Sequence, residues 1–436
     1  MNWLVGAILL LLLALILDFG LLAYAMYVLL GVLLVSRYLT RAWAEGMSAE
    51  RECNSLTANI GETVAVVVRV TNAGRFPVPW VLLEDLLPRH ALIHRPPNLG
   101  VQGQRIKLAM LRGGATKTLL YQLQCNRRGY YQLGPLILET GDLFGLHRRY
   151  RVATAPHFLL VYPQVMPLEG YDIASRRPIG EVRMAYRLDE DPTRIAGVRQ
   201  YEVGDPLRRV HWKATARTGR LHCKVYEPST VAGVTMLLDF HAASHDPRHE
   251  PLRSELAITA AASLANAVYE MGQQVGLVTN GRDAADRIRQ EGWDYDLRTR
   301  DAARKAAGMA EASERLRPVI VATRRGPDQV LRIFETLARL ELTDGLDLTQ
   351  LIGETNGQLP RDATIVAILP QVTERDAIAL GNLKRQGFAV TAVLNLYEEY
   401  DFAQASGPLR TQGIPTRHLR DERAIVDFCR QLAWRN

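Results

Sequence analysis

An apolar run close to the start of the chain constrains its fold more than any other feature. Residues 3–36 read WLVGAILLLLLALILDFGLLAYAMYVLLGVLLVS, with Asp18 as their only charge. As one helix the run would be about 50 Å long, against about 30 Å for the hydrocarbon core of a bilayer. A single span would also hold the Asp18 carboxylate near the bilayer centre, at a cost of about 3 kcal/mol. We therefore predict a transmembrane helical hairpin over residues 1–40 that turns at Asp18-Phe19-Gly20, with one long span as the alternative.

The basic residues beside this run predict its orientation. No Lys or Arg precedes the run, whereas Arg37, Arg41 and Arg51 follow it. The same order argues against a cleaved signal peptide, which begins with a positively charged segment. By the positive-inside rule, residue 37 onward lies in the cytoplasm. The sequence therefore predicts a multi-pass protein of the cell membrane, with two spans and cytoplasmic soluble domains.

Composition indicates that the rest of the chain is folded but does not identify a partner. Of the 436 residues, 47% are hydrophobic and 23% are charged, which is ordinary for two or three globular domains. The net charge of +7 is small where 53 basic residues face 46 acidic ones, and this balance does not by itself decide for or against a nucleic-acid partner. We predict no nucleic-acid partner, because the most basic segment of the chain, residues 204–224, has only one aromatic residue within its expected helix. The cysteines lack the spacing of a zinc site and are interpreted as thiols of a reducing compartment: Cys53, Cys125, Cys223 and Cys429.

Periodicity divides the remainder into an all-β part and an α/β part. Segments such as ETVAVVVRVTNAG alternate with period two and end in turn residues, which is typical of a β-sandwich. Later segments switch to continuous apolar strands such as VTMLLDF, alternating with long helices, which is typical of an α/β domain. The prediction is an α+β multidomain protein with a β-sandwich over 48–165, a connector over 166–197 and a last part over 198–436.

A dense basic segment opens that last part. Residues 204–224 read GDPLRRVHWKATARTGRLHCK. Asp205 is a favourable N-cap followed by proline, and Gly219 is a favourable residue to end a helix. We expect a helix between them with Leu207, Val210 and Ala214 on its inner face, followed by an alternating strand, LHCKVY. The basic side chains would then lie on the outer face.

This segment resembles the signature of the family called domain of unknown function 58. The pattern R-x-Y-x-x-G-D-x-x-R-x-[IV]-H-W-K-x-[ST]-A-R-x-G-x-L is matched at every fixed position: Arg199, Tyr201, Gly204, Asp205, Arg208, His211, Trp212, Lys213, Ala216, Arg217, Gly219 and Leu221. The stretch RRGYYQLGPLILETGDLFGL ahead of it is also similar to the family. The resemblance implies a von Willebrand factor type A-like C-terminal domain and association with MoxR-type AAA+ ATPases.

Type A domains often bind Mg²⁺ through D-x-S-x-S at the end of their first strand. Here the corresponding residues are Asp239-Phe240-His241-Ala242-Ala243, so the carboxylate is present and both hydroxyls are missing. Pro370 and Gln371 stand where a later strand would supply another Asp. Because Mg²⁺ needs oxygen ligands, we predict that Asp239 is the remnant of a degenerate site and that no metal or other cofactor is bound.

The basic segment has several possible roles. An enzyme would use His211 or His222 as base with Asp205 orienting it, but Asp205 is better explained as an N-cap, and neither G-x-S-x-G nor a phosphate loop occurs. A structural tie through Glu202 or Glu227 is another possibility. We predict no catalytic residue and a membrane-anchored interaction protein that partners a MoxR-type ATPase in assembly or maturation of other proteins. The alternative is a hydrolase or metal-dependent enzyme that uses the 199–224 cluster.

Overall fold

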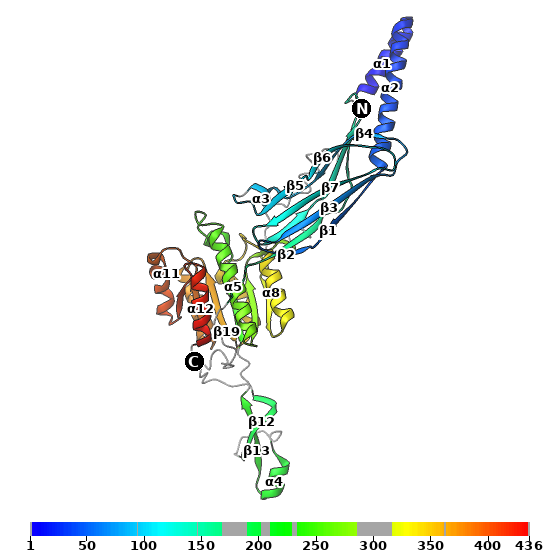
Figure 1. Cartoon of the computed structure of the whole chain (residues 1–436). Coiled ribbons are helices and arrows are strands. Elements are labelled where there is room, and N and C mark those ends of the chain that lie inside the picture. The colour runs from blue at the N-terminus through cyan, green and yellow to red at the C-terminus, as the bar shows by residue number, and fades with distance from the viewer. Residues whose placement is uncertain are drawn as a thin grey trace. The chain divides into compact units, whose positions relative to one another are not determined.

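The chain is an α+β multidomain protein with an apolar N-terminal helix, a β-sandwich and a mixed α/β sheet domain (Figure 1). The computed structural model describes residues 2–93, 95–145, 147–167, 190–201, 210–228, 233–285, 316–361 and 363–434. Two compact units are present. The first comprises Met1–Gln164, Asp283–Ser313 and Glu335–Leu340, and the second comprises Val165–Arg282, Glu314–Phe334 and Glu341–Asn436.

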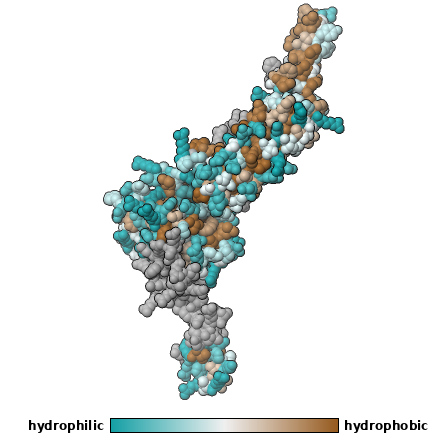
Figure 2. Space-filling view, in the orientation of Figure 1, coloured by the Kyte–Doolittle hydropathy of each residue, from teal (hydrophilic) through white to brown (hydrophobic). Residues whose placement is uncertain are grey.

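Two apolar helices begin the first unit, α1 (Asn2–Ile16) and α2 (Gly20–Glu45). The break between them falls at the predicted position, where Asp18 adopts a left-handed conformation with φ of 57°. The helices pack through a small apolar cluster of Leu11, Ala14 and Ala23. Within the described residues, α2 alone is long and apolar enough to cross a membrane, since α1 is shorter. Figure 2 shows hydrophobic surface along this helical part.

The β-sandwich follows directly from α2. One sheet has the order β1-β3-β7-β5, the second β10-β9-β4-β6, and a small third sheet β2-β11-β8. In β3 every second residue from Val64 to Val70 is a buried valine, so one face of the strand is buried and the other is not. The period-two pattern predicted such a strand correctly. The elements are β1 (Met47–Cys53), β2 (Thr57–Asn59), β3 (Thr63–Asn72), β4 (Val78–Asp85), α3 (Arg89–Ile93), β5 (Leu99–Gly103), β6 (Ile106–Leu111), β7 (Thr116–Cys125), β8 (Gly129–Leu133), β9 (Leu136–Gly141), β10 (Arg148–Val152) and β11 (His157–Tyr162).

The second unit contains a six-stranded sheet of order β17-β15-β14-β19-β20-β21. All neighbouring pairs are parallel except β15 with β17, which makes the sheet mixed. Its elements are β14 (Gly233–Leu238), α5 (Leu252–Glu270), β15 (Gln274–Thr279), β17 (Val319–Arg324), α8 (Pro327–Arg339), α9 (Leu348–Thr355), β19 (Ala363–Leu369), α10 (Glu374–Arg385), β20 (Val390–Leu394), α11 (Glu399–Thr411), β21 (Thr416–His418) and α12 (Glu422–Trp434), with a short pair β16 (Arg282–Asp283) and β18 (Leu340–Glu341).

The strand order of this sheet reverses between β14 and β19. The chain moves outward from β14 through β15 to β17, and then returns to β19 on the other side of β14. In open α/β sheets, ligands usually bind at the carboxyl ends of the strands beside such a reversal. The residues that follow β14 and β19 are therefore candidates for a ligand site.

Candidate functional site

The described residues of the signature lie on, or between the strands of, a β-hairpin made of β12 (Glu190–Gln200) and β13 (His222–Pro228). The strands are antiparallel, with Arg199 opposite Cys223 and Gln200 opposite His222. A short helix, α4 (Trp212–Thr218), lies in the segment that joins the two strands and contacts β13 (Figure 1). Strand β12 begins inside the stretch that the sequence had indicated as a connector, residues 166–197.

Helix α4 starts later than predicted. Val210 forms an antiparallel bridge with Cys223, so the backbone is extended at that point and the helix begins only at Trp212. His211 is the N-cap, and its Nδ1 accepts the Ala214 N–H at 3.0 Å. The predicted end is confirmed: Gly219 has φ of 71°, and its N–H donates to the Thr215 carbonyl. The proposed N-cap Asp205, with Gly204 and Arg208, lies outside the described residues.

The outer surface of α4 is cationic and aromatic. Val210 and Cys223 are buried beneath it, whereas no residue of α4 itself is buried. Trp212 is 68% exposed, and Lys213 and Arg217 are also exposed. Neither of these two basic side chains has a hydrogen bond or ion pair within the described part of the chain. The expectation that Ala214 would join a buried face was wrong, because that residue is only half-buried.

Hydrogen bonds within and beside the signature support the hairpin locally. Nδ1 of His222 lies 3.1 Å from the Thr218 hydroxyl oxygen and 2.8 Å from the Arg220 carbonyl oxygen. The Tyr201 N–H donates to the Leu221 carbonyl, and the Arg199 guanidinium donates to the Gln200 carbonyl at 3.1 Å. The sequence also suggested structural ion pairs of the basic residues with Glu202 or Glu227. Both of those side chains lie outside the part of the chain that the structure describes. The arrangement offers hydrogen-bond donors and positive charge to a ligand.

Asp239 directly follows β14 at the reversal of the α/β sheet and is buried there. Its Oδ1 accepts the Asn280 side-chain N–H at 2.8 Å and the His241 backbone N–H at 3.2 Å. Asn280 follows β15 and accepts the Phe240 N–H at 2.6 Å, so the two side chains join the loops after neighbouring strands. Burial raises the pKa of Asp239, while the hydrogen bonds from Asn280, His241 and Ser244 oppose that shift.

The residues around Asp239 do not fit a magnesium ion. His241 uses Nδ1 to accept the Ala243 N–H at 3.2 Å, and the Ala243 side chain has no ligand atom. Within the residues that the structure describes, no three or more His, Cys, Asp or Glu side chains gather as a metal site would need. A nearby pair joins His245 Nδ1 and Glu250 Oε1 at 2.9 Å. Burial acts to raise the pKa of Glu250, but hydrogen bonds from His245 and Ser254 hold it below its ordinary value.

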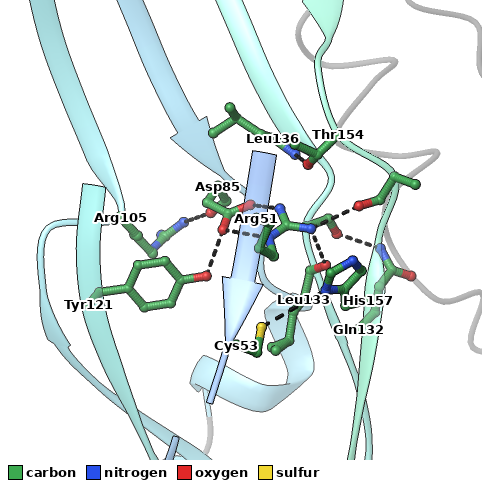
Figure 3. A network of polar contacts seen from close by, with 12 residues as sticks. Arg51, Cys53, Asp85, Arg105, Tyr121, Gln132, Leu133, Leu136, Thr154 and His157 are labelled. Carbon is green, nitrogen blue, oxygen red and sulfur yellow. Dashed lines mark hydrogen bonds and ion pairs between the residues drawn. The ribbon is translucent and has the colours of Figure 1, made fainter. Parts of the chain in front are cut away.

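The β-sandwich contains a fully buried ion pair between Arg51 and Asp85. Figure 3 shows the Asp85 carboxylate between the Arg51 guanidinium and the Tyr121 hydroxyl, which donates to it at 2.7 Å. Arg51 also donates to the Leu133 and Ala155 carbonyls at 3.0 and 2.9 Å. The pair therefore has hydrogen-bond partners from several strands, which is the condition under which a buried charge pair is tolerated.

Cys53 and His157 lie beside this ion pair, with 3.9 Å between Sγ and Nδ1. Burial raises the pKa of the Cys53 thiol, with Arg51 opposing. Burial lowers the pKa of His157, and the Arg51 charge adds to that shift. A nucleophilic cysteine needs the opposite shifts, because the thiolate and the imidazolium are its reactive form. The arrangement is therefore that of a structural core.

Sequence reasoning missed three of these groupings: the Arg51–Asp85–Tyr121 network, the Asp239–Asn280 contact and the His245–Glu250 pair. The first two join residues that are distant in the chain, and no local pattern marks them. His245 and Glu250 are five residues apart, and this spacing by itself does not predict that the two side chains are in contact.

Comparison with known proteins identifies the family of the signature hairpin. Residues 197–298 match the family described as "Protein of unknown function DUF58", and the chain therefore contains a domain of that family, as the resemblance predicted. The "Uncharacterized protein YeaD" of Bacillus subtilis (strain 168) is 24% identical over 236 residues, which is 54% of this chain. The match spans 56% of that relative's length.

Solved structures with similar parts are distant. The CARDB domain of a Pyrococcus furiosus protein has 12% identity and a TM-score of 0.20, over 26% of this chain and 86% of that one. Proximal thread matrix protein 1 from the mussel byssus has 9% identity and a TM-score of 0.29, over 46% of this chain and 48% of that one. The pilus adhesin SpaC from Lactobacillus rhamnosus GG has 10% identity and a TM-score of 0.30, over 46% of this chain and 30% of that one.

Proposed function

We propose that this protein is a membrane-anchored, non-catalytic interaction protein that uses the α4 hairpin to bind an acidic partner. In this proposal α1 and α2 both cross the membrane, the soluble parts are cytoplasmic, and the mixed sheet belongs to the von Willebrand factor type A-like class. The partner is a MoxR-type AAA+ ATPase, which the family resemblance alone suggests, and the complex serves assembly or maturation of other proteins.

The observation that carries the proposal is the exposure of α4. Trp212, Lys213 and Arg217 all face solvent, although α4 is short and Val210 and Cys223 are buried beside it. Trp and Arg are enriched among the residues that contribute most to binding at protein interfaces. Lys and Arg without an intramolecular partner also attract an acidic surface over several ångströms, so association should slow as salt is added.

The test compares two charge reversals in the full-length protein. Lys213→Glu with Arg217→Glu reverses the α4 surface, and Arg375→Glu with Arg410→Glu reverses two exposed cations on α10 and α11 as a matched control. Both variants should keep a melting temperature close to wild type, as surface changes usually do. Co-purification of the ATPase, measured by quantitative mass spectrometry, should fall severalfold for the first variant and stay unchanged for the control.

Two results would contradict the proposal. Equal losses of ATPase in both variants would show that general positive charge, and not α4, drives the association. A large drop in the melting temperature of the α4 variant, with a partner loss that follows the unfolded fraction, would show that Lys213 and Arg217 are structural ties.

A further inference from the structure

The turn between β9 and β10 presents two large apolar side chains on its surface. Leu143 and Phe144 are 75% and 72% exposed, although both lie in a short turn of an otherwise well-packed sheet. Strands β9 and β10 contact the C-terminal half of α2, so this turn lies beside the apolar helix and not on a distant edge of the sandwich.

Hydrogen bonds hold the turn in this conformation. The Ser36 hydroxyl on α2 donates to the Asp142 carboxylate, which also accepts the His147 N–H at 3.0 Å. The Trp80 indole N–H donates to the Asp142 carbonyl at 3.3 Å. Gly145 then takes a positive φ of 72°, which a glycine adopts without strain. The exposure of the two apolar side chains is therefore built into the turn.

An apolar groove separates the turn from α2. It has a volume of about 350 Å³ and is lined mainly by apolar side chains, with Val28, Val32 and Leu39 on one side and Leu143 and Phe144 on the other. A pocket of this size and character suits a hydrophobic ligand.

A tryptophan also contributes to the groove. Trp43 lines the groove, and its indole nitrogen is buried with no hydrogen-bond partner within the described residues. Tryptophan is enriched where hydrocarbon meets headgroups, with its ring in the apolar region and its N–H near polar groups.

The lengths of α1 and α2 place the turn at the edge of the hydrocarbon core of the bilayer. From Gly20 to Ser36, where α2 contacts the turn, the helix rises about 24 Å, and the whole of α1 rises about 22 Å. The hydrocarbon core of a bilayer is about 30 Å thick. If both helices cross, the acyl chains must extend past Ser36 and reach the turn. Arg37 and Arg41 are exposed beyond Ser36. Arg41 is about 32 Å along the helix from Gly20, at the level expected for headgroups.

We propose that Leu143 and Phe144 insert into the cytoplasmic leaflet and that the groove between this turn and α2 holds one lipid acyl chain. This inference rests on the membrane anchoring proposed above. The occupant is lipid because the groove continues the exposed apolar surface of α2 and is lined by apolar side chains apart from Ser36 and Asp142. These two polar side chains are hydrogen-bonded to each other. The turn thereby fixes how deeply the β-sandwich sits against the bilayer.

Photocrosslinking in the full-length protein tests the inference. The protein is reconstituted into vesicles of phosphatidylcholine and phosphatidylglycerol, with p-benzoylphenylalanine replacing one residue at a time: Phe144, Tyr24 or Ile93. Tyr24 is an exposed residue of α2 outside the groove and reports anchoring. Ile93 in α3 is 72% exposed, like Phe144, but follows the end of β4 that points away from α2 (Figure 1), and is the matched control. Leu143 replaces Phe144 as the probe site if that variant has a lowered melting temperature.

We expect lipid adducts by mass spectrometry at residues 24 and 144, several times more abundant than at residue 93. Adducts at residue 24 but not at residue 144, adducts of residue 144 with protein only, or equal lipid adducts at residues 93 and 144 would overturn the inference while the anchoring stands. Absence of lipid adducts at residue 24 would overturn the anchoring, and the inference with it.

Discussion

At the scale of single residues, the buried polar groups of this protein act as structural ties. Arg51 and Asp85 are both fully buried, so each depends on the other and on the surrounding carbonyl and hydroxyl groups to offset the loss of water. A change at either residue leaves an uncompensated charge inside the sandwich.

We expect Asp85→Asn to destabilise the β-sandwich strongly. The change preserves shape but leaves the Arg51 charge without a counterion, and breaking a buried pair in this way costs about 3–5 kcal/mol. The melting temperature of the sandwich transition in the full-length protein should fall by about 10 °C or more. Glu52→Gln removes the exposed ion pair with Arg69 and should change little. Equal, small effects of both variants would contradict a structural role for the Arg51–Asp85 pair.

Asp239 should make the α/β domain less stable as pH rises. Burial raises its pKa above the ordinary value of 3.8, so the folded state binds this proton more tightly than the unfolded chain. The free energy of unfolding therefore falls as the pH rises from 3.8 to the raised pKa of Asp239, and it stays lower at neutral pH. Asp239→Asn should raise the melting temperature at pH 7, and the difference from wild type should shrink near pH 4. Asp344→Asn, at an exposed carboxylate, serves as the control in the same thermal scans. A difference that does not depend on pH would show that Asp239 ionisation is not the cause.

At the scale of elements, α4 is a seven-residue helix that relies on its two ends. So short a helix has little intrinsic stability, because few hydrogen bonds offset the ordering of its backbone. The His211 cap and the left-handed Gly219 therefore determine whether the Trp212 and Arg217 side chains are presented together.

Gly219→Ala should loosen α4 without disturbing the rest of the protein. A Cβ at Gly219 would meet no atom within 4 Å, so its effect comes from the positive φ alone. That strain is about 1 kcal/mol, equivalent to about fivefold faster exchange of the α4 amides with deuterium. Gly114→Ala has the same positive φ and the same open space in a sandwich turn, and should leave α4 exchange unchanged. If α4 exchange is equal in both variants, Gly219 is not the determinant of the helix end.

At the scale of the whole molecule, the proposed location of the soluble parts depends on the N-terminal helices. The break at Asp18 and the contact between α1 and α2 are compatible with a hairpin that returns to the side from which it started. In the orientation proposed above, both ends of the hairpin lie on the cytoplasmic side and Asp18 lies on the opposite side.

We expect reporters fused after residue 45 and after residue 230 to be active only as cytoplasmic reporters. Asp18→Cys should react with a membrane-impermeant maleimide added to intact cells, since the turn lies at the outer interface in a two-span arrangement. Activity of an extracytoplasmic reporter at either fusion point would exclude the orientation. Lack of labelling at residue 18 with cytoplasmic reporters would favour one long span.

The sequence predicted the parts that depend on near neighbours. The break at Asp18, the period-two strand β3 and the end of α4 at Gly219 each follow from residues within one or two turns. The start of α4 was not predictable in this way. Asp205 and the following proline are good helix-starting residues, but Val210 pairs with Cys223. This longer-range strand contact holds the backbone extended at Val210, and the helix begins at Trp212.

The sequence by itself determined the order of an apolar helical segment, a β-sandwich and an α/β sheet, because hydrophobic periodicity reports which face of each element is buried. Only the tertiary structure decided what meets each buried face. The ion pair joins Arg51 to Asp85, which is 34 positions further along the chain. The contact of Ser36 with Asp142 spans 106 positions. Periodicity carries no information on such pairing, since any apolar or polar partner of suitable size satisfies the same pattern. The groove beside α2 forms where the contact of Ser36 with Asp142 holds a turn of the sandwich against the helix.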